Sequence, residues 1–250
     1  MKTLIIRPGG IGDCILCFPA MEALRSEYTE VWTPSSVVPL VQFADVVRSI
    51  AGSGIDVVGL PGRHLPAHLW DFDRIVSWYG ANRPEFIEAV RALPFEFHQA
   101  LPPPGCGMHA TDFFLSQTGV PPGALARIEI ESGPTTGTVI HPFSGGVRKN
   151  WPLANFREVA ARLSHVQWLA GPDESLDGST HFDSLLDVAK RIGGAKLYIG
   201  NDSGITHLAA AVGARVIAIF GPTDPRVWAP RGKNVHVLVN PTPLDVLRLC

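Results

Sequence analysis

Short runs of consecutive apolar residues recur along the chain, and longer segments with apolar residues at helical spacing lie between them. A strand that is buried on both faces gives such a run, whereas a helix packed on a sheet shows one apolar stripe. The first run, Leu4–Ile6, precedes a helical pattern over Ile11–Leu24. Pro19 should kink or restart that helix, because proline donates no backbone hydrogen bond. The alternation predicts a parallel β-sheet covered by helices on both faces.

The same pattern continues through both halves of the chain. In the N-terminal half, it predicts strands at 31–32, 56–58 and 74–79 and helices at 84–93 and 108–117. In the C-terminal half, it predicts strands at 138–140, 166–169, 196–199, 216–220 and 235–239 and helices at 153–163, 181–192, 205–212 and 243–249. The alternation is cleaner in this second half.

A turn-rich stretch separates the two halves. It runs from Gly119 to Pro134 and contains three glycines and three prolines. Glycine and proline gathered in this way mark a linker. We therefore expect an α/β protein with two Rossmann-like domains, residues 1–132 and 133–250, that face each other across a cleft.

The composition is that of an ordinary globular protein. Of the 250 residues, 46% are hydrophobic and 18% are charged, and the formal net charge is −2. This balance excludes a disordered chain and a coiled coil, and it lacks the basic excess typical of proteins that bind nucleic acid. The longest apolar stretch, Leu208–Phe220, is far shorter than the ~20 residues of a membrane span. The apolar N-terminal run is too short for a signal peptide, so we expect a cytoplasmic protein.

The charge is divided unevenly between the halves. Residues 1–134 carry 9 Lys and Arg against 14 Asp and Glu, whereas residues 135–250 carry 12 against 9. The C-terminal half is therefore the better candidate for an anionic ligand. The four cysteines form no disulfide framework. Cys14 and Cys17 form a C-x-x-C pair without a second zinc-ligand pair, so we expect them to be buried as small apolar residues.

Three segments that follow predicted strands carry candidate chemistry. The first is the loop Arg7-Pro8-Gly9-Gly10-Ile11-Gly12-Asp13. Open α/β sheets bind ligands at such loops, although this one lacks the G-x-G-x-x-G dinucleotide fingerprint. Asp13 would repel a phosphate and fits better as a base beside a hydroxyl group. The structural alternative is that Asp13 caps or stabilises the helix start.

The second segment, His141–Pro152, leaves a strand, crosses Gly145 and Gly146, and carries Arg148 and Lys149 before a predicted helix. Glycines let backbone N–H groups approach an anion closely. The two cations would neutralise a diphosphate. A solvated basic turn, with Trp151 as a packing residue, is the structural alternative.

The third segment, Gly200–His207, leads into an Ala-rich helix. Asp202 or Ser203 would cap this helix, and the free N–H groups at its start would point at a phosphate. His207 lies in the first turn, where it would donate to the same anion. A capped, buried helix with a hydrogen-bonded histidine is the alternative. A further loop at a strand end, Phe220–Pro225, follows.

Together these segments resemble glycosyltransferase family 9, the ADP-heptose:lipopolysaccharide heptosyltransferases of Gram-negative bacteria. The early motif Arg-x-x-x-(Ile/Leu)-Gly-Asp, continued by Pro and Leu-Arg, matches Arg7, Gly12, Asp13, Pro19, Leu24 and Arg25. The central Lys-x-Trp-Pro matches Lys149–Pro152. The Asp-Ser-Gly-x-x-His-x-Ala-Ala block and the Phe-Gly-Pro-Thr that follows it match Asp202–Ala210 and Phe220–Thr223. The resemblance is strong over residues 138–232 and otherwise confined to the first part of the N-terminal half.

The resemblance implies a GT-B fold and inverting, metal-independent transfer of a heptose-like sugar. The donor would be a nucleotide-diphospho-sugar, expected to be ADP-linked, and the acceptor a hydroxyl group of a glycan or glycolipid. It implies Asp13 as the general base, in an acceptor-side loop with Arg7, Gly10 and Gly12. Lys149 would lie beside the diphosphate, Glu174 would hold the ribose, and residues 203–205 would supply backbone donors. The full set implied for the donor is Gly145, Gly146, Arg148, Lys149, Glu174, Asp202, Ser203, Gly204, Ile205, His207 and Thr223.

Two features depart from the family. The N-terminal domain is shorter than in typical members, and it is acidic although the usual acceptor is a phosphorylated glycolipid. Asp71-Phe72-Asp73 looks like a metal-binding D-x-D. We interpret it as strand-edge charge, because it lies in the poorly matched half, and we expect no metal and at most peripheral contact with the inner face of the inner membrane.

Two other functions remain open from the sequence. A sugar-nucleotide epimerase of GT-B fold would hold the same nucleotide diphosphate, but it would act without an acceptor. A non-catalytic module that binds a nucleotide or glycan would suit the short N-terminal half. Such a module has no need of both a base and a diphosphate-binding cation, so the presence of Asp13 and Lys149 favours the transferase.

Overall fold

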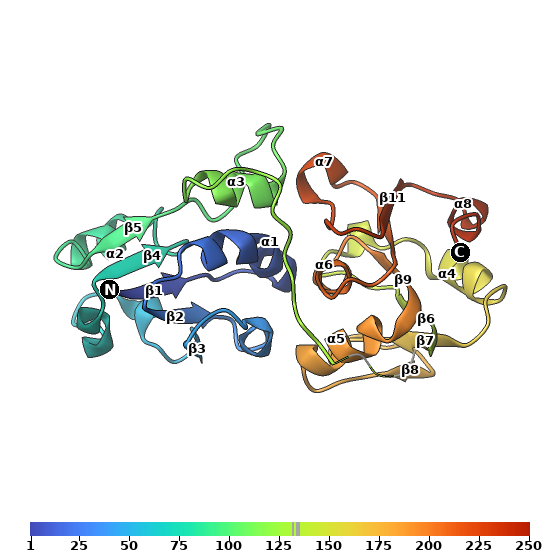
Figure 1. Cartoon of the computed structure of the whole chain (residues 1–250), viewed down its shortest axis with the longest axis horizontal. Coiled ribbons are helices and arrows are strands. Elements are labelled where there is room, and N and C mark those ends of the chain that lie inside the picture. The colour runs from blue at the N-terminus through green and yellow to red at the C-terminus, as the bar shows by residue number, and fades with distance from the viewer. Residues whose placement is uncertain (132, 134–135) are drawn as a thin grey trace. The chain divides into compact units, whose positions relative to one another are not determined.

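The computed structural model describes residues 1–131, 133 and 136–250. They form two compact units, each built on one parallel sheet (Figure 1). The N-terminal unit comprises Met1–Cys106 and Ala110–Ala124, and the C-terminal unit comprises Gly107–His109 and Leu125–Cys250. The boundary expected after residue 132 falls on a residue outside the described part of the chain. Among the described residues, no helix combines the length and apolarity needed to cross a bilayer.

The N-terminal unit contains a five-stranded parallel sheet with the order β3-β2-β1-β4-β5. Its strands are β1 (Lys2–Ile6), β2 (Tyr28–Thr33), β3 (Val46–Ser49), β4 (Arg74–Ser77) and β5 (Phe95–Phe97). Its helices are α1 (Ile11–Ala23), α2 (Pro84–Ala89) and α3 (Ala110–Ser116), with 3₁₀ turns at Val38–Leu40, Ile55–Val57 and Ala67–Asp71. A strand order of 3-2-1-4-5 is that of a Rossmann-like sheet.

The central strand, β1, is buried on both faces. Leu4, Ile5 and Ile6 are fully buried, since β2 and β4 flank β1 and other elements cover the sheet. Leu4 and Ile6 belong to a core that includes Phe86 of α2. Helices α1 and α3 pack against each other (Figure 1). The continuous apolar run therefore forms the doubly covered strand that its pattern predicts.

One predicted strand of this unit is wrong. Residues 56–58 do not form a strand, and a 3₁₀ turn covers Ile55–Val57 instead. Gly54 and Gly59, which flank it, have φ values of 76° and 87°. Such positive φ values turn the chain sharply and are incompatible with a strand. The apolar side chains still enter the core, because Ile55 and Val58 are buried.

Other differences concern the limits of elements. Strands β3 and β5 were not predicted, because they form the two edges of the sheet and contain no fully buried residue. Helix α2 ends at Ala89, before the predicted end at 93. Helix α1 continues through Pro19 as one helix, and Pro19 is buried in it. Burial of the α1 face thus outweighs the lost hydrogen bond.

A buried carboxylate ties the turn Ala67–Asp71 to strand β2. Glu30 has no exposed surface, and it accepts hydrogen bonds from Trp32 Nε1 at 2.7 Å and Arg48 Nε at 2.8 Å. His68 Nε2 lies 3.1 Å from the same carboxylate, and His68 Nδ1 lies 2.9 Å from Asp71. Burial alone would raise the pKa of Glu30, but the donated hydrogen bonds outweigh it and lower the pKa.

The C-terminal unit contains a six-stranded parallel sheet with the order β11-β10-β9-β6-β7-β8. Its strands are β6 (Thr136–His141), β7 (Val166–Leu169), β8 (Ser179–Thr180), β9 (Ala195–Asn201), β10 (Val216–Phe220) and β11 (Val235–Val239). Its helices are α4 (Leu153–Ala160), α5 (Leu185–Gly193), α6 (Gly204–Ala211), α7 (Pro225–Trp228) and α8 (Pro243–Leu247), with a 3₁₀ turn at Val147–Lys149. The predicted helix at 181–192 begins later, at Leu185, and α7 was not predicted.

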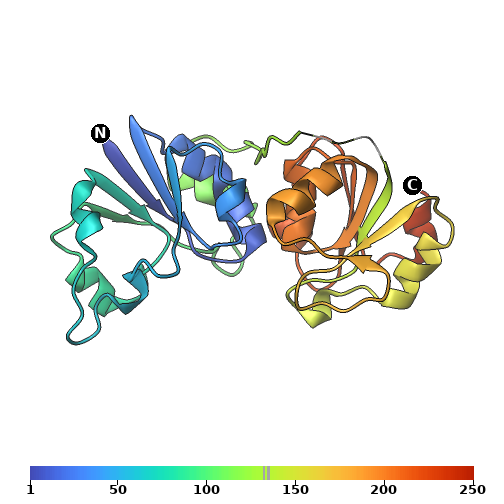
Figure 2. The same ribbon diagram turned by 90° about the horizontal axis from the view of Figure 1, so that it is seen from below.

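Helices cover both faces of this sheet. Figure 2 shows α5 and α6 in orange on one face and α4 and α8, in yellow and red, on the other. The strands alternate accordingly: Tyr198 and Ala218 pack with the α5–α6 side, whereas Ile199 and Ile217 pack with the α4–α8 side. Because both faces are covered, every residue of β10 is buried. This explains why the strands of this half gave the clearest apolar runs.

Candidate functional site

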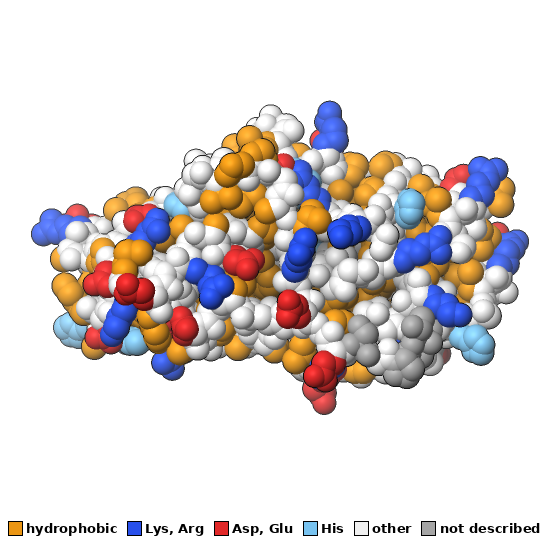
Figure 3. All heavy atoms as spheres, viewed as in Figure 1, with side chains coloured by type: hydrophobic (Ala, Val, Ile, Leu, Met, Phe, Trp, Pro, Cys, Tyr) orange, Lys and Arg blue, Asp and Glu red, His pale blue; other side chains and the backbone are white. Residues whose placement is uncertain are grey.

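The loops after β6, β9 and β10 carry most of the residues expected to bind the donor. These strands are neighbours in the sheet, so the loops that follow His141, Asn201 and Phe220 meet at one edge. Open α/β sheets bind ligands at this carboxyl edge. Basic side chains predominate over the C-terminal unit on the face that Figure 3 shows, in keeping with the sequence of that half.

Ser144 shapes the loop after β6. Its hydroxyl lies 2.8 Å from the Gly146 carbonyl oxygen and 2.9 Å from Asn150 Oδ1. Gly145 and Gly146 precede the turn Val147–Lys149, which carries Arg148 and Lys149. Arg148 is exposed. The turn therefore presents two adjacent cations at the carboxyl edge of the sheet.

Lys149 and Asp202 connect two of these loops. Lys149 Nζ lies 2.8 Å from Asp202 Oδ2, and the side chains are 38% and 5% exposed respectively. A carboxylate as deeply buried as Asp202 is stable only beside a compensating cation. Lys149 supplies that cation while part of its own side chain faces solvent. The ammonium group can therefore neutralise a bound anion without leaving the pair.

The N-terminus of α6 lies next to this ion pair. Ser203 is the N-cap residue, and its hydroxyl accepts a hydrogen bond from the Thr206 backbone N–H. The N–H groups of Gly204 and Ile205, in the first turn, have no partner within the helix. Unpaired N–H groups and the helix dipole together favour an anion at this position. The geometry is that expected for a phosphate-binding helix start.

Close packing beneath the loop requires Gly200. A Cβ atom at this position would collide with the hydroxyl groups of Tyr198 and Thr206, which lie 3.1 Å apart. Thr206 in turn donates a hydrogen bond to the Asn201 carbonyl. Burial raises the pKa of Tyr198, so its phenol stays neutral and hydrogen-bonded. Gly200 therefore serves the packing of α6 on β9.

His207 lies in the first turn of α6 and is 6% exposed. Burial lowers its pKa to about 4, and the cation of Lys149 adds to this effect while the nearby Asp202 carboxylate opposes it. The imidazole is therefore uncharged at neutral pH. It can offer an N–H group to an anion, but not a full positive charge.

Glu174 lies after β7 and contacts the end of the neighbouring strand β6. Its Oε2 lies 2.9 Å from His141 Nε2 and accepts a hydrogen bond from the Gly171 backbone N–H at 2.5 Å. Burial would raise the pKa of Glu174, but the His141 and Gly171 hydrogen bonds outweigh it and lower the pKa. Glu174 is thus an ionised acceptor at the same edge of the sheet as Lys149.

Thr223 lies in the loop after β10 and is partly buried. The next residue, Asp224, is the N-cap of α7 and accepts a hydrogen bond from the Arg226 backbone N–H at 2.9 Å. The loop after β10 therefore ends in another capped helix start at the carboxyl edge.

The sequence predicted no role for Asn201, yet its side chain links the loop after β6 to the end of β9. Its Nδ2 donates to the Pro142 carbonyl at 2.7 Å, and its Oδ1 accepts from the Trp151 backbone N–H at 2.9 Å. Asn201 is completely buried. The available signal was its place just after a predicted strand, since a polar residue there faces neighbouring loops. His141, the last residue of β6, carried the same signal.

In the N-terminal unit, Asp13 lies in the first turn of α1 and is partly buried. Its Oδ2 accepts a hydrogen bond from the Gly10 backbone N–H at 3.1 Å. Gly9 has a φ of 121°, and a Cβ atom there would lie 3.3 Å from Asp13 Cβ. Gly10 and Gly12 flank the start of the same helix. The loop is thus folded tightly around the Asp13 carboxylate.

Arg7 lies beneath this loop and is only 1% exposed. It donates to the carbonyl groups of Ala100 and Asp13, each at 3.0 Å, and its guanidinium carbon lies 4.7 Å from the Phe114 ring centroid. The sequence predicted Arg7 as part of the acceptor-side loop. Its side chain is instead buried under that loop, so it can affect the loop only through contacts inside the protein. It supports the backbone of Asp13.

The cysteine pair is buried, as expected. Cys14 and Cys17 have no exposed surface, and burial raises the pKa of Cys17 to about 12. Both thiols are therefore protonated and unreactive at neutral pH. Of the D-x-D pair, Asp71 is bonded to His68, and Asp73 accepts from the Lys2 backbone N–H. Within residues 1–131, 133 and 136–250, no group of three or more His, Cys, Asp or Glu side chains is arranged to hold a metal.

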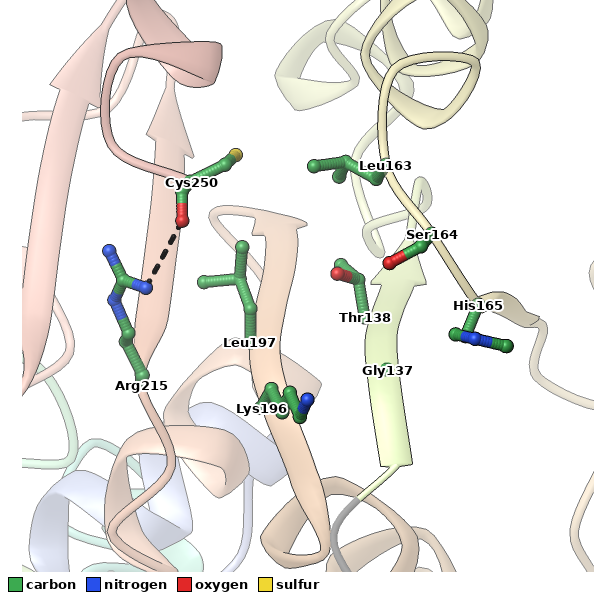
Figure 4. Close-up of a pocket in the computed structure, with 9 residues that line it drawn as sticks. All are labelled: Gly137, Thr138, Leu163, Ser164, His165, Lys196, Leu197, Arg215 and Cys250. Carbon is green, nitrogen blue, oxygen red and sulfur yellow. Dashed lines mark hydrogen bonds between the residues drawn. The ribbon is translucent and has the colours of Figure 1, made fainter.

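A cavity of about 590 Å³ lies at the opposite edge of the C-terminal sheet (Figure 4). It is lined by residues at the amino ends of strands, including Gly137 of β6 and Lys196 of β9. Arg215, just before β10, reaches across to the Cys250 carbonyl at 3.3 Å. The candidate donor residues all lie at the carboxyl ends of the strands, so this cavity is not part of their site.

Comparison with known proteins finds a similarity over part of the chain. Residues 132–245 match the model of glycosyltransferase family 9 (heptosyltransferase). The similarity to this family therefore lies in the C-terminal half of the chain. The matched range contains the Lys149 turn, Glu174 and the start of α6, which are the parts of the candidate donor site described above.

Curated relatives match part of the chain. Lipopolysaccharide heptosyltransferase 1 of Salmonella typhimurium is 32% identical over 109 residues, which make up 37% of this chain and 34% of the relative. The equivalent protein of Escherichia coli K12 is 31% identical over 105 residues, or 36% and 33% of the two chains. The matched segment thus spans about a third of the length of each relative.

The fold extends the similarity to the whole chain. The structure of E. coli ADP-heptose lps heptosyltransferase II superimposes with a TM-score of 0.76 at 15% identity, over 100% of this chain and 97% of the other. At this identity the match concerns the fold alone. Two Rossmann-like units of this kind constitute the GT-B fold, as expected from the sequence.

Proposed function

We propose that the protein is an inverting, metal-independent glycosyltransferase. It transfers a heptose-like sugar from an ADP-linked donor to a hydroxyl group of a glycan or glycolipid. The observation that carries the proposal is the junction of the Lys149–Asp202 pair with the free N–H groups of Gly204 and Ile205. A cation and a helix start at one strand edge suit a diphosphate.

The donor is bound by the C-terminal unit. Lys149, with Arg148 beside it, and the start of α6 hold the two phosphates, while Gly145 and Gly146 let the backbone approach them. Glu174 accepts a hydrogen bond from a ribose hydroxyl group, as an acidic residue does in many Rossmann-like nucleotide sites. Asp202, His207 and Thr223 complete the surroundings of the donor.

The reaction is a single displacement. Asp13 removes the proton from the acceptor hydroxyl as that oxygen attacks the anomeric carbon. The bond from this carbon to the diphosphate breaks on the opposite face, so the configuration inverts and ADP leaves with the electron pair. General-base assistance is typically worth 10²–10⁴-fold. Lys149 and the α6 N–H groups stabilise the charge that grows on the leaving diphosphate.

The family resemblance gives least support for the acceptor. The N-terminal half is acidic in sequence, whereas the usual acceptor of the family is a phosphorylated glycolipid. We propose a glycolipid or glycan presented at the cytoplasmic face of the inner membrane, with peripheral contact at most.

The test is a release assay with the full chain. ADP-, GDP- and UDP-linked sugars are supplied with and without a lipopolysaccharide-core acceptor, and free nucleoside diphosphate is measured. We expect acceptor-dependent release from the ADP-sugar, and NMR of the product should show an inverted anomeric centre. Isomerised donor without acceptor would indicate the epimerase, and binding without turnover would indicate a non-catalytic module. Either result would overturn the proposal.

A further inference from the structure

His141 and Glu174 form a partly buried pair between two neighbouring strand ends. His141 is the last residue of β6 and is 4% exposed, and Glu174 follows β7. Strands β6 and β7 pair directly, with Ile140 opposite Trp168. His141 and Glu174 are 33 positions apart in the sequence, but they meet because their strands are neighbours in the sheet.

The two oxygens of the Glu174 carboxylate differ in their surroundings. Oε2 receives both inward contacts, from His141 Nε2 at 2.9 Å and from the Gly171 backbone N–H at 2.5 Å. No hydrogen bond from the described residues reaches Oε1, and the Glu174 side chain is 25% exposed. One oxygen is thus anchored in the protein, and the other remains available as an acceptor.

Only one of the two ring nitrogens of His141 makes a hydrogen bond to the described residues. An ionised Glu174 can only accept, so Nε2 must carry the hydrogen of the His141–Glu174 bond. The other ring nitrogen, Nδ1, is buried without a partner among the described residues. An unpaired buried polar atom is costly, and a histidine kept only for packing would have its polar atoms paired or be replaced by an apolar residue. The ring is therefore placed to serve Glu174.

We propose that His141 is a positioning residue that sets the sugar specificity of the nucleotide site. By holding Oε2, it fixes the carboxylate so that Oε1 faces the ligand and accepts from a hydroxyl group of the vicinal diol of ribose. The inference rests on the proposed function, because it takes the ligand to be a ribonucleoside diphosphate. It adds a residue and a consequence: discrimination of ribose from deoxyribose depends on His141.

The other contact of this loop supplies a control. His181 contacts the backbone of the same loop, where its Nδ1 is 3.1 Å from the Gly171 carbonyl oxygen and its Nε2 is 3.2 Å from Ser179 Oγ. It is exposed, and it makes no hydrogen bond to Glu174. A change at His181 disturbs the same loop without touching the anchored oxygen.

The experiment measures the affinities of ADP, 2′-deoxy-ADP and 3′-deoxy-ADP by calorimetry. In the wild-type protein, we expect at least one deoxy analogue to bind roughly tenfold more weakly than ADP, since it lacks a hydrogen bond to a charged group. His141→Phe keeps a ring but removes the donor, and the preference should fall below about threefold. His141→Gln places an amide nitrogen at the same bond count from Cβ as Nε2, so it should keep most of the preference.

The controls separate a positioning role from a structural one. His181→Gln should leave the ribose preference unchanged, and Glu174→Gln should abolish it. In the Glu174→Gln background, His141→Phe should cause no further change in the preference. If His141→Phe fails to fold, His141→Asn replaces it, because its amide stops at the position of Nδ1 and cannot reach Glu174.

The outcomes also distinguish the two proposals. If the wild-type protein binds no nucleoside diphosphate, the proposed function fails, and this inference fails with it. If the wild-type protein binds ADP but accepts both deoxy analogues equally, only the inference is overturned. The same holds if folded His141→Phe or His141→Asn protein keeps the full preference, or if His181→Gln loses it.

Discussion

The guanidinium of Arg7 holds the backbone carbonyl of Asp13 at 3.0 Å, while the Asp13 carboxylate bonds separately to the Gly10 N–H at 3.1 Å. The backbone of Asp13 is therefore supported independently of its side chain. Substituting the carboxylate should leave the loop in place. This makes Asp13 a suitable position for separating a chemical role from a structural one.

Asp13→Asn should lower turnover by roughly 10²-fold or more, because an amide cannot accept the acceptor's proton. The amide oxygen can still accept from Gly10, so the melting temperature should change little and stability by at most ~1 kcal/mol. Donor binding should stay near that of the wild type. Turnover and melting are measured on the same preparation. A stable Asp13→Asn protein with normal turnover would exclude Asp13 as the base.

Lys149→Ala should weaken ADP binding by on the order of 1–3 kcal/mol, the range for a hydrogen bond to a charged group. It also strips the buried Asp202 of its cation, so stability should fall as well. Lys149→Arg is the matched control, since it keeps the charge. Calorimetry is run below the melting transition of each variant. Unchanged ADP affinity in Lys149→Ala would remove Lys149 from the site.

Transferase activity should survive EDTA, because Lys149 and the helix start supply the stabilisation that a metal gives elsewhere. The assay follows ADP release before and after chelation, with Mg²⁺, Mn²⁺ or Fe²⁺ added back. Activity that is lost to EDTA and restored by one of these ions would contradict the metal-independent mechanism. Asp71 and Asp73 would then be the first residues to substitute.

The C-terminal unit should become less stable as the pH falls. The pKa of His207 is about 4 in the folded protein, below its ordinary value of 6.5, so the unfolded chain binds more protons between these values. Stability is fully present above pH 6.5 and should decline by on the order of 2–3 kcal/mol towards pH 4. His207→Asn removes this titration. Denaturation at several pH values should therefore give a shallower acid slope for the variant, and identical slopes would refute the assignment.

The sequence predicted the strands best where both faces of the sheet are covered. Strand β10 is a run of five buried residues, and its pattern admits one interpretation. Strands β3 and β5 escaped prediction because edge strands with exposed positions carry no such run. Glu30 also escaped notice, since an acidic residue within a strand usually faces solvent, whereas here the side chains of Tyr28, Trp32, Arg48 and His68 lie within hydrogen-bond distance of its carboxylate.

The candidate site was predictable to the extent that it is contiguous in the chain. The Lys149 turn and the Ser203 cap each lie in one segment, where glycines, cations and a capping residue follow a strand. The pairs Lys149–Asp202 and His141–Glu174 join separate segments, and only the order of strands in the sheet brings them together. Sequence spacing contains no information on that order.

Two side-chain hydrogen bonds of Asn201 tie both ends of the loop after β6, at Pro142 and at Trp151, to the end of β9. These hydrogen bonds consequently hold the loops around the candidate site in place before any ligand binds. Nucleotide binding should then require little ordering of the backbone, and the entropy of assembling the site is lost during folding instead. A substitution at Asn201 would act at a distance, because each loop could fold while their mutual alignment became variable. The fixed position of these loops therefore favours nucleotide binding, because less conformational entropy is lost when the ligand binds.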